Sequence, residues 1–158
     1  MGGRILLLRK EGSSKTMGST VTDEKGRFRV ESLAPGNYRV YLRPLFKPAA
    51  GEPVGRSEPF QVREGMSPLK IQVPVQPAAA IQGSLDRPPA KGAVVIARVE
   101  GWLQPFHAKV DPAGLFRIGG LPPGKTKLKA ICGKLRGSLE LLTSPGETTR
   151  VVIHLQPK

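Results

Sequence analysis

The sequence predicts an all-β chain of two small antiparallel β-sandwiches in tandem, the first of which lacks its opening strand. Glycine and proline make up 35 of the 158 residues, roughly twice their average share, which indicates many turns and argues against long helices. Between the turns lie short runs in which apolar and polar residues alternate, the period of a strand with one buried face. An internal repeat then divides the chain into two copies.

The repeat appears when residues 22–42 are set beside residues 110–130. Seven positions match without a gap at a spacing of 88 residues, namely Asp23, Gly26, Phe28, Val30, Leu33, Pro35 and Gly36 with Asp111, Gly114, Phe116, Ile118, Leu121, Pro123 and Gly124. The same spacing places Ile5–Leu8 on Ala93–Ile96. Self-similarity of this kind marks repeated structural units. We therefore predict two domains, 1–76 and 77–158, joined at Pro74–Ala79.

Each copy combines two turns with strands of about five residues. In the Asp-x-x-Gly turn, the Asp side chain can accept a hydrogen bond from the backbone two residues on, and the Gly tolerates positive φ. Alternation predicts a buried face formed by Phe28, Val30, Leu33, Tyr38, Val40 and Leu42, and in the second copy by Phe116, Ile118, Leu121, Thr126, Leu128 and Ala130. The second turn, Leu33–Gly36, is predicted to close a hairpin.

The remaining predicted strands follow from the same alternation. They are Ile5–Lys10, Ser57–Arg63 and Leu69–Val75 in the first copy, and Ala80–Leu85, Ala93–Val99, Phe106–Val110, Gly137–Leu142 and Thr149–Leu155 in the second. Gly12–Gly18 and Phe46–Gly55 are predicted loops. Subtracting 88 from Ala80–Leu85 places the counterpart of this strand before residue 1, so the first copy begins at its second strand.

An unfilled strand position exposes backbone groups and part of the core. Three explanations stay open at this point. The chain is cut from a longer protein, the first domain is simply shorter, or another chain donates the strand by β-augmentation at the incomplete edge.

The string from Thr22 to Val40 resembles the signature of carboxypeptidase regulatory-like domains, which are Ig-like, transthyretin-like β-sandwiches. The second copy, Asp111 to Leu128, matches nearly as well and departs at Thr126, where the family usually has an aromatic residue. The resemblance implies non-catalytic spacer, adhesive or carbohydrate-contacting modules of larger bacterial envelope or extracellular proteins. It therefore implies an extracytoplasmic location, although Ile5–Leu8 is too short for a signal-peptide core.

No catalytic or metal-binding constellation is recognisable. The single cysteine, Cys132, lies at an apolar strand end and is expected to be a buried thiol. His107 and His154 are far apart in the sequence and are expected at exposed positions, whereas zinc needs three or four converging ligands. The string Gly124-Lys125-Thr126 lacks the upstream glycine of a phosphate-binding loop. We predict a protein that is not an enzyme and that holds neither cofactor nor metal.

The formal charge of +13 is spread over both copies, and a field of this sign attracts polyanions. We predict an anion-binding face from Arg27, Arg29, Arg39, Tyr41 and Arg43 in the first copy and from Arg117, Lys127 and Lys129 in the second. Its partner would be an anionic polysaccharide or the envelope surface. The alternative is a solvated face whose cations suppress sheet aggregation.

Nucleic acid is the less favoured partner, because its recognition uses aromatic side chains on which bases stack. The chain has five Phe, two Tyr and one Trp, and Tyr41 is the single stacking candidate among the basic residues. Trp102 either stacks on a sugar ring or packs against a neighbouring module.

Overall fold

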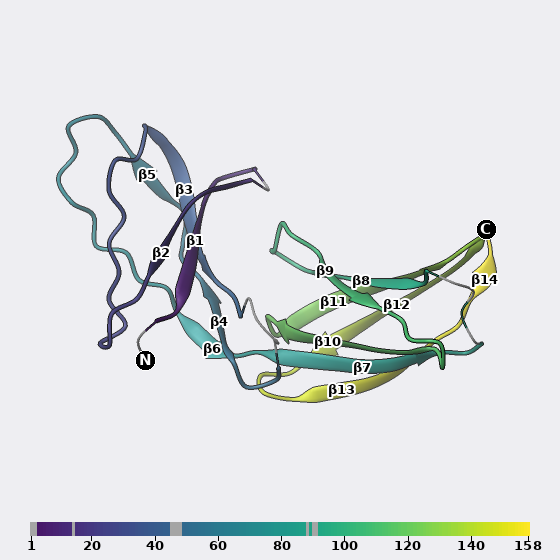
Figure 1. Ribbon diagram of the computed structural model, residues 1–158. Helices are drawn as coiled ribbons and strands as arrows, with labels where there is room; N and C mark the ends of the chain where they lie inside the picture. The colour runs from purple at the N-terminus through teal and green to yellow at the C-terminus, as the bar shows by residue number, and fades with distance from the viewer. Residues whose placement is uncertain (1–2, 14, 45–48, 88, 90–91) are drawn as a thin grey trace. The chain divides into compact units, whose positions relative to one another are not determined.

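The computed structural model describes residues 3–13, 15–44, 49–87, 89 and 92–158. The chain divides into two compact units, Met1–Phe46 with Pro53–Gln76 and Lys47–Glu52 with Pro77–Lys158. The described residues form strands and no helix, which confirms the all-β class. None of the described residues therefore belongs to an apolar helix long enough to cross a membrane. Figure 1 shows the strands of each unit.

The first unit is built on one sheet with the strand order β2-β1-β3-β4-β6, in which β5 also pairs with β3. Its strands are β1 (Ile5–Lys10), β2 (Thr16–Val21), β3 (Gly36–Leu42), β4 (Pro53–Arg56), β5 (Phe60–Val62) and β6 (Val75–Pro77). One face of β1 and β3 carries the core, formed by Leu6, Leu8, Tyr38, Val40 and Leu42. The predicted buried face of β3, formed by Tyr38, Val40 and Leu42, is therefore confirmed.

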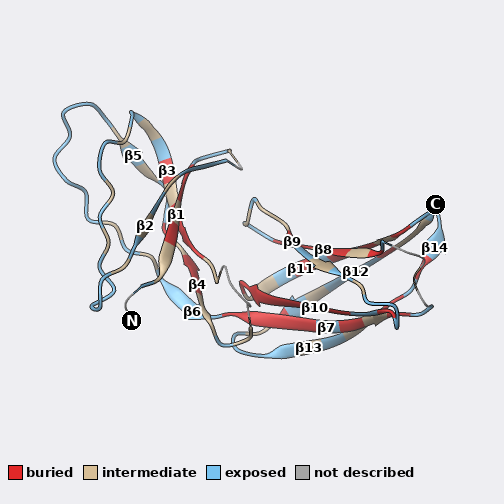
Figure 2. Cartoon of the chain, in the orientation of Figure 1, coloured by how far each residue is buried: buried red, intermediate tan, exposed pale blue. Residues whose placement is uncertain are grey.

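The second unit is a sandwich of two sheets. The sheet β10-β7-β13 contains β7 (Ala79–Leu85), β10 (Leu115–Leu121) and β13 (Thr148–Ile153). The sheet β14-β12-β11-β8-β9 contains β8 (Val94–Val99), β9 (Phe106–Lys109), β11 (Gly124–Cys132), β12 (Leu135–Thr143) and β14 (Gln156–Pro157). The inner faces pack on each other, and Ile81, Leu121, Leu128 and Ile153 are almost fully buried between them (Figure 2).

The predicted Asp-x-x-Gly turns are confirmed in both units. The Asp23 carboxylate accepts hydrogen bonds from the backbone N–H groups of Lys25 and Arg27 at 2.9 and 2.8 Å. Asp111 does the same for Ala113 and Leu115, at 2.9 and 2.8 Å. The turn glycines have φ values of 77° and 85°. The spacing of 88 residues also separates the first residues of β3 and β11, Gly36 and Gly124.

The predicted hairpin at Leu33–Gly36 is wrong. In the second unit the equivalent residues lead from β10, in one sheet, to β11, in the other. The turn therefore joins two layers of a sandwich, and residues on its two sides do not share a face. The sheet β10-β7-β13 is also not purely antiparallel, because β13 runs parallel to β7.

Two predicted strand regions of the first unit are not strands. Residues 27–35 have no strand assignment, and the predicted strand Leu69–Val75 is unpaired until β6 begins at Val75. Ser57–Arg63 is a strand only at β5, while the predicted loops Gly12–Gly18 and Phe46–Gly55 partly belong to β2 and β4. Residues 46–48 of the second loop lie outside the described residues. Within the described residues, no strand precedes β1.

Two short strands of the first unit take the place of the single strand β12. Both β4 and β5 pair antiparallel with β3, as β12 pairs with β11. Ser57 interrupts them, and its hydroxyl oxygen accepts a hydrogen bond from the backbone N–H of Val40 at 3.0 Å. Gly55 on β4 pairs with Leu42, and Gly137 on β12 pairs with Ala130, 88 residues after Leu42. Both glycines lie directly under backbone of a later segment.

We predict that Gly55→Ala destabilises the first unit by roughly 1–3 kcal/mol, the usual cost of overpacking. A Cβ atom at residue 55 would collide with the carbonyl oxygen of Pro74. The measurement is amide hydrogen exchange of Val40 and Leu42 in the full chain. The control is Gly18→Ala in β2, where a Cβ atom meets nothing within 4 Å; equal effects of the two substitutions would contradict the packing.

Asp86 ties the end of β13 to the end of β7. Its carboxylate accepts a hydrogen bond from the backbone N–H of Leu155 at 3.0 Å and lies 3.3 Å from Nδ1 of His154. The Leu155 hydrogen bond, followed by the His154 contact, lowers the pKa of Asp86. A carboxyl group with a lowered pKa stabilises the folded state above its ordinary pKa of about 4, and the contribution disappears as the pH falls through the lowered value.

We therefore expect Asp86→Asn to be less stable than the original chain at pH 6 and the difference to shrink below about pH 4. Urea unfolding followed by circular dichroism from pH 6 to pH 2.5 measures it. Glu140→Gln is the control, because the Glu140–Lys127 ion pair is exposed on both sides and such pairs contribute little. A difference that does not vary with pH would rule out the assigned role of the carboxylate.

Candidate functional site

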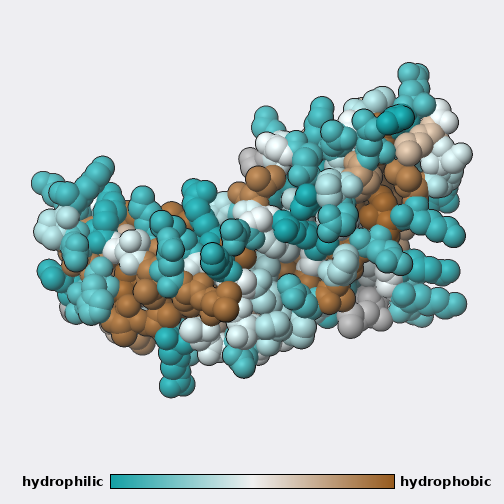
Figure 3. Space-filling model, turned by 180° about the vertical axis from the view of Figure 1, so that it is seen from behind, coloured by the Kyte–Doolittle hydropathy of each residue, from teal (hydrophilic) through white to brown (hydrophobic). Residues whose placement is uncertain are grey.

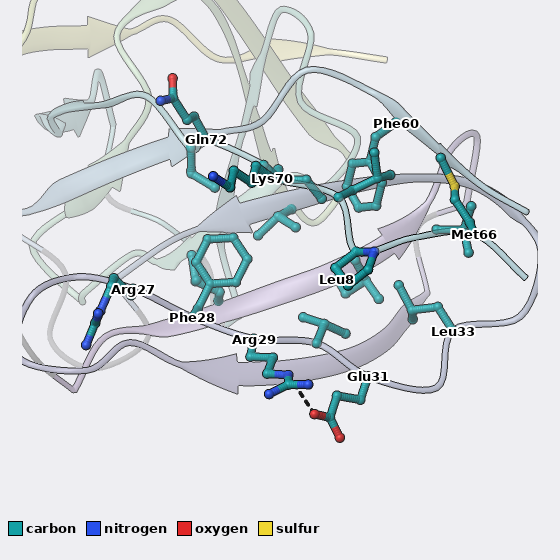
Figure 4. A pocket seen from close by; sticks show the side chains of 18 of the residues that line it. Leu8, Arg27, Phe28, Arg29, Glu31, Leu33, Phe60, Met66, Lys70 and Gln72 are labelled. Atoms are coloured by element: carbon teal, nitrogen blue, oxygen red, sulfur yellow. Dashed lines mark ion pairs between the residues drawn. The ribbon is translucent and has the colours of Figure 1, made fainter.

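The described residues of the first unit form an apolar groove of about 1510 Å³. Its floor is the core face of β1 and β3, and its sides are residues 27–33 and 63–75. The apolar side chains that line it include Leu6, Leu8, Phe28, Val30, Leu33, Val40, Phe60, Val62 and Val73. In Figure 4, Leu8, Phe28, Leu33 and Phe60 point into the space between the two sides. We call this feature the apolar groove.

Arg27 and Arg29 at the rim of the apolar groove point away from it (Figure 4), and each is ion-paired. Arg29 Nε lies 2.6 Å from Glu31 Oε1, and the Arg29 side chain is 84 % exposed. Arg27 Nε lies 2.8 Å from Asp23 Oδ2. The backbone and side-chain hydrogen bonds from Arg27 lower the pKa of Asp23, which keeps the turn carboxylate charged. Arg27 and Arg29 are thus exposed cations of the rim.

The other basic candidates of the first unit lie on the opposite face of β3. Arg39 Nη2 contacts Glu11 Oε1 at 3.2 Å. Tyr41 is only 4 % exposed, and the Arg9 guanidinium lies over its ring at 5.3 Å from the ring centre, a cation–π contact. Burial lowers the pKa of Arg43, and the charge of Arg9 lowers it further.

The prediction of one exposed basic face in the first unit is therefore wrong. Residues 27–30 do not pair with β3, because the Leu33–Gly36 turn leads into another layer. Tyr41 is buried and does not offer its ring to a ligand in this structure. Arg9 was missed by the sequence analysis. The signal was the uninterrupted apolar run Ile5–Leu8, which is typical of a strand covered on both faces.

The predicted basic residues of the second unit do not share one face either. Arg117 lies on the outer face of β10, whereas Lys127 and Lys129 lie on the outer face of β11 in the other sheet. The cross-strand pairing of β8, β9 and β11 brings together, on one exposed face, Arg98, Lys109, Lys125, Lys127 and Lys129. We call these five residues the basic face. Glu140 lies on the same face, 3.0 Å from Lys127 Nζ.

The remaining single residues have structural positions. Cys132 is a buried free thiol, as predicted. His107 and His154 are exposed, as predicted. Trp102 is half-buried and packs against the core of its own unit. Among the described residues, no group of three or more His, Cys, Asp and Glu side chains could hold a metal ion.

Comparison with known proteins identifies similar structures and no family. No protein-family model matches the chain, and no curated protein matches it significantly. The minor pilin GBS52 of Streptococcus agalactiae is 16 % identical, with a TM-score of 0.48 over 100 % of this chain and 84 % of the pilin. The TIE protein of Bacillus anthracis is 13 % identical, with a TM-score of 0.38 over 99 % of this chain and 35 % of that chain. Both are similar to this chain in fold alone.

Proposed function

We propose that the chain is a pair of non-catalytic β-sandwich modules that binds another protein, as a segment of a larger bacterial envelope or extracellular protein. The repeated residues support a structural role, because Asp23 and Asp111 hold turns while Phe28 and Phe116 pack on the two cores. Their pattern resembles that of carboxypeptidase regulatory-like domains, which supports the extracytoplasmic location.

The apolar groove is the observation that carries the proposal. It is lined by core residues of β1 and β3. Within the second unit, the corresponding core face of β8 and β11 is covered by the complete sheet β10-β7-β13. Met66 and Leu69 on its side are 44 % and 45 % exposed. Figure 3 shows one face of the chain, with hydrophobic side chains visible between hydrophilic ones. Apolar grooves rimmed by polar groups mark binding sites for other macromolecules.

The test of the proposal uses Nile red, a neutral dye that the positive charge of the chain does not attract. We expect saturable binding of the dye to the full chain. Val73→Asp, on the inner side of the groove wall, should weaken this binding about tenfold, because a charge in an apolar site is strongly disfavoured. The control is Gln72→Asp, whose side chain is exposed. Loss of binding in both variants, or in neither, would contradict a role for the groove.

The basic face of the second unit supports a second function, contact with an anionic polysaccharide or an envelope surface. It places five cations and one carboxylate on one exposed sheet face. Charges opposite one another on neighbouring strands repel by up to about 1 kcal/mol, so the sheet gains nothing in stability from this arrangement. The buried position of Tyr41 does not favour the nucleic-acid alternative.

We expect Lys129→Glu to weaken heparin binding to the full chain about tenfold at low salt, because the basic face loses its field there. Arg117→Glu changes the net charge equally but lies on the other sheet, so it should have a much smaller effect. Titrations at two salt concentrations, with duplex DNA as a second ligand, measure both. Equal losses in the two variants would mean that only the net charge matters.

A further inference from the structure

We propose that the apolar groove is an acceptor site for one β-strand of another polypeptide chain, which completes the second sheet of the first unit. This inference rests on the proposed function and specifies the partner of the same groove. The first unit has an open layer where the second unit has the complete sheet β10-β7-β13. In that sheet β7 is the central strand, paired on both sides.

One side of the groove corresponds to β10. Subtracting 88 from Leu115–Leu121 gives Arg27–Leu33, which lines the groove. The same Asp-x-x-Gly turn precedes both segments. Phe28 and Val30 pack against the core of the first unit, as Phe116 and Ile118 do in the second.

The other side of the groove corresponds to β13. The glycine positions establish this, because a Cβ atom at Gly137 would lie 2.5 Å from the His154 carbonyl oxygen, and one at Gly55 would collide with that of Pro74. Residue 74 therefore has the place of residue 154. With this spacing of 80 residues, Val73 corresponds to Ile153. Val73 packs against the core of the first unit, and Ile153 belongs to the core of the second.

The central position between these two segments is open. In the second unit, β7 pairs antiparallel with β10 and parallel with β13. In the first unit, residues 27–35 and 63–74 have no strand pairing within the part of the chain that the structure describes. Figure 2 shows the contrast between the red strands β7 and β10 and the pale segments of the first unit. Two unpaired edges with an apolar floor between them form a slot for a single strand.

The equivalence also specifies the chemistry of the added strand. Gly83 of β7 lies between Phe116 and Val151, and a Cβ atom there would lie 2.5 Å from Phe116 Cζ and 2.8 Å from Val151 Cγ2. The counterparts of these neighbours in the first unit are Phe28 and Ile71. The added strand therefore needs a glycine opposite Phe28, with apolar residues two positions before and after it.

The outward positions of the added strand meet cations. Gln82 of β7 pairs with Arg117 on one side and Arg150 on the other. The corresponding residues of the first unit are Arg29 and Lys70, both exposed. An acidic residue of the partner strand at this position lies between two cations, a favourable cross-strand arrangement. The partner is thus an extended segment of about seven residues with an apolar–acidic–glycine core.

The experiment uses a fluorescent peptide with the sequence of residues 77–87, which contains β7, added to the full chain. We expect saturable binding in fluorescence anisotropy and new amide protection in residues 27–33 and 68–73. Gln82→Glu in the peptide should tighten binding by a few-fold. Ile81→Asp and Gly83→Val should each weaken binding at least tenfold, the first by burying a charge and the second by steric overlap. Val73→Asp in the chain should abolish binding, and Gln72→Asp should not.

A second form of the chain keeps the test decisive if the free peptide binds weakly. The same peptide is joined to residue 1 through a flexible Gly/Ser linker, which raises its effective concentration. We expect the fused strand to protect residues 27–33 and 68–73 and to raise the midpoint of unfolding of the first unit. No new protection from either the free or the fused strand would overturn the inference.

The outcomes separate this inference from the proposed function. Nile red binding that depends on Val73, without any response to the strand, would overturn the strand acceptor and leave the protein-binding groove standing. Loss of both would overturn both. Dimerisation of the chain alone, with protection of the same residues, would assign the groove to a second copy and overturn the peptide partner.

Discussion

The pairing of one central strand with two neighbours at once decides whether each unit closes its core. In the second unit β7 satisfies the backbone groups of β10 and β13 and covers the apolar face of the opposite sheet. Buried backbone N–H and C=O groups must be hydrogen-bonded. The segments on either side of a central strand therefore form strands only where the central strand is there to pair with them. The first unit has counterparts of both neighbours, with similar apolar residues, and neither is a strand. The difference between the units is therefore a difference in pairing.

The sequence predicted the features that depend on neighbouring residues. The Asp turns, the positive-φ glycines and the buried side of β3 all follow from local pattern, and the structure has them. It failed for residues 27–33, because their alternation equals that of β10 and alternation alone does not show whether a strand lies beside them. It also failed for Tyr41, because alternation along β3 does not show that its second face is buried as well. Long-range pairing and cover are thus the information that a local reading lacks.

The predicted basic residues show the same limit of local sequence pattern, because their grouping depends on which sheet each strand joins. Alternation places a cation on the outside of a strand but does not say which sheet the strand joins. Arg117 and Lys129 have the same alternation and lie on different sheets, because the connection between β10 and β11 crosses from one layer to the other. The cations that do share a face come from β8, β9 and β11, which are separated in the sequence and paired in the fold. The sheet topology of a sandwich therefore decides which of its charged residues share a surface, and composition alone does not.

The distribution of aromatic residues has a practical consequence. The only Trp, Trp102, packs against the core of the second unit, while both tyrosines, Tyr38 and Tyr41, are buried in the first. Light at the red edge of aromatic absorption therefore excites a probe in the second unit alone, whereas tyrosine emission arises in the first. The chain carries a separate optical reporter in each module without any label, so the order in which the two modules lose their structure is open to direct observation.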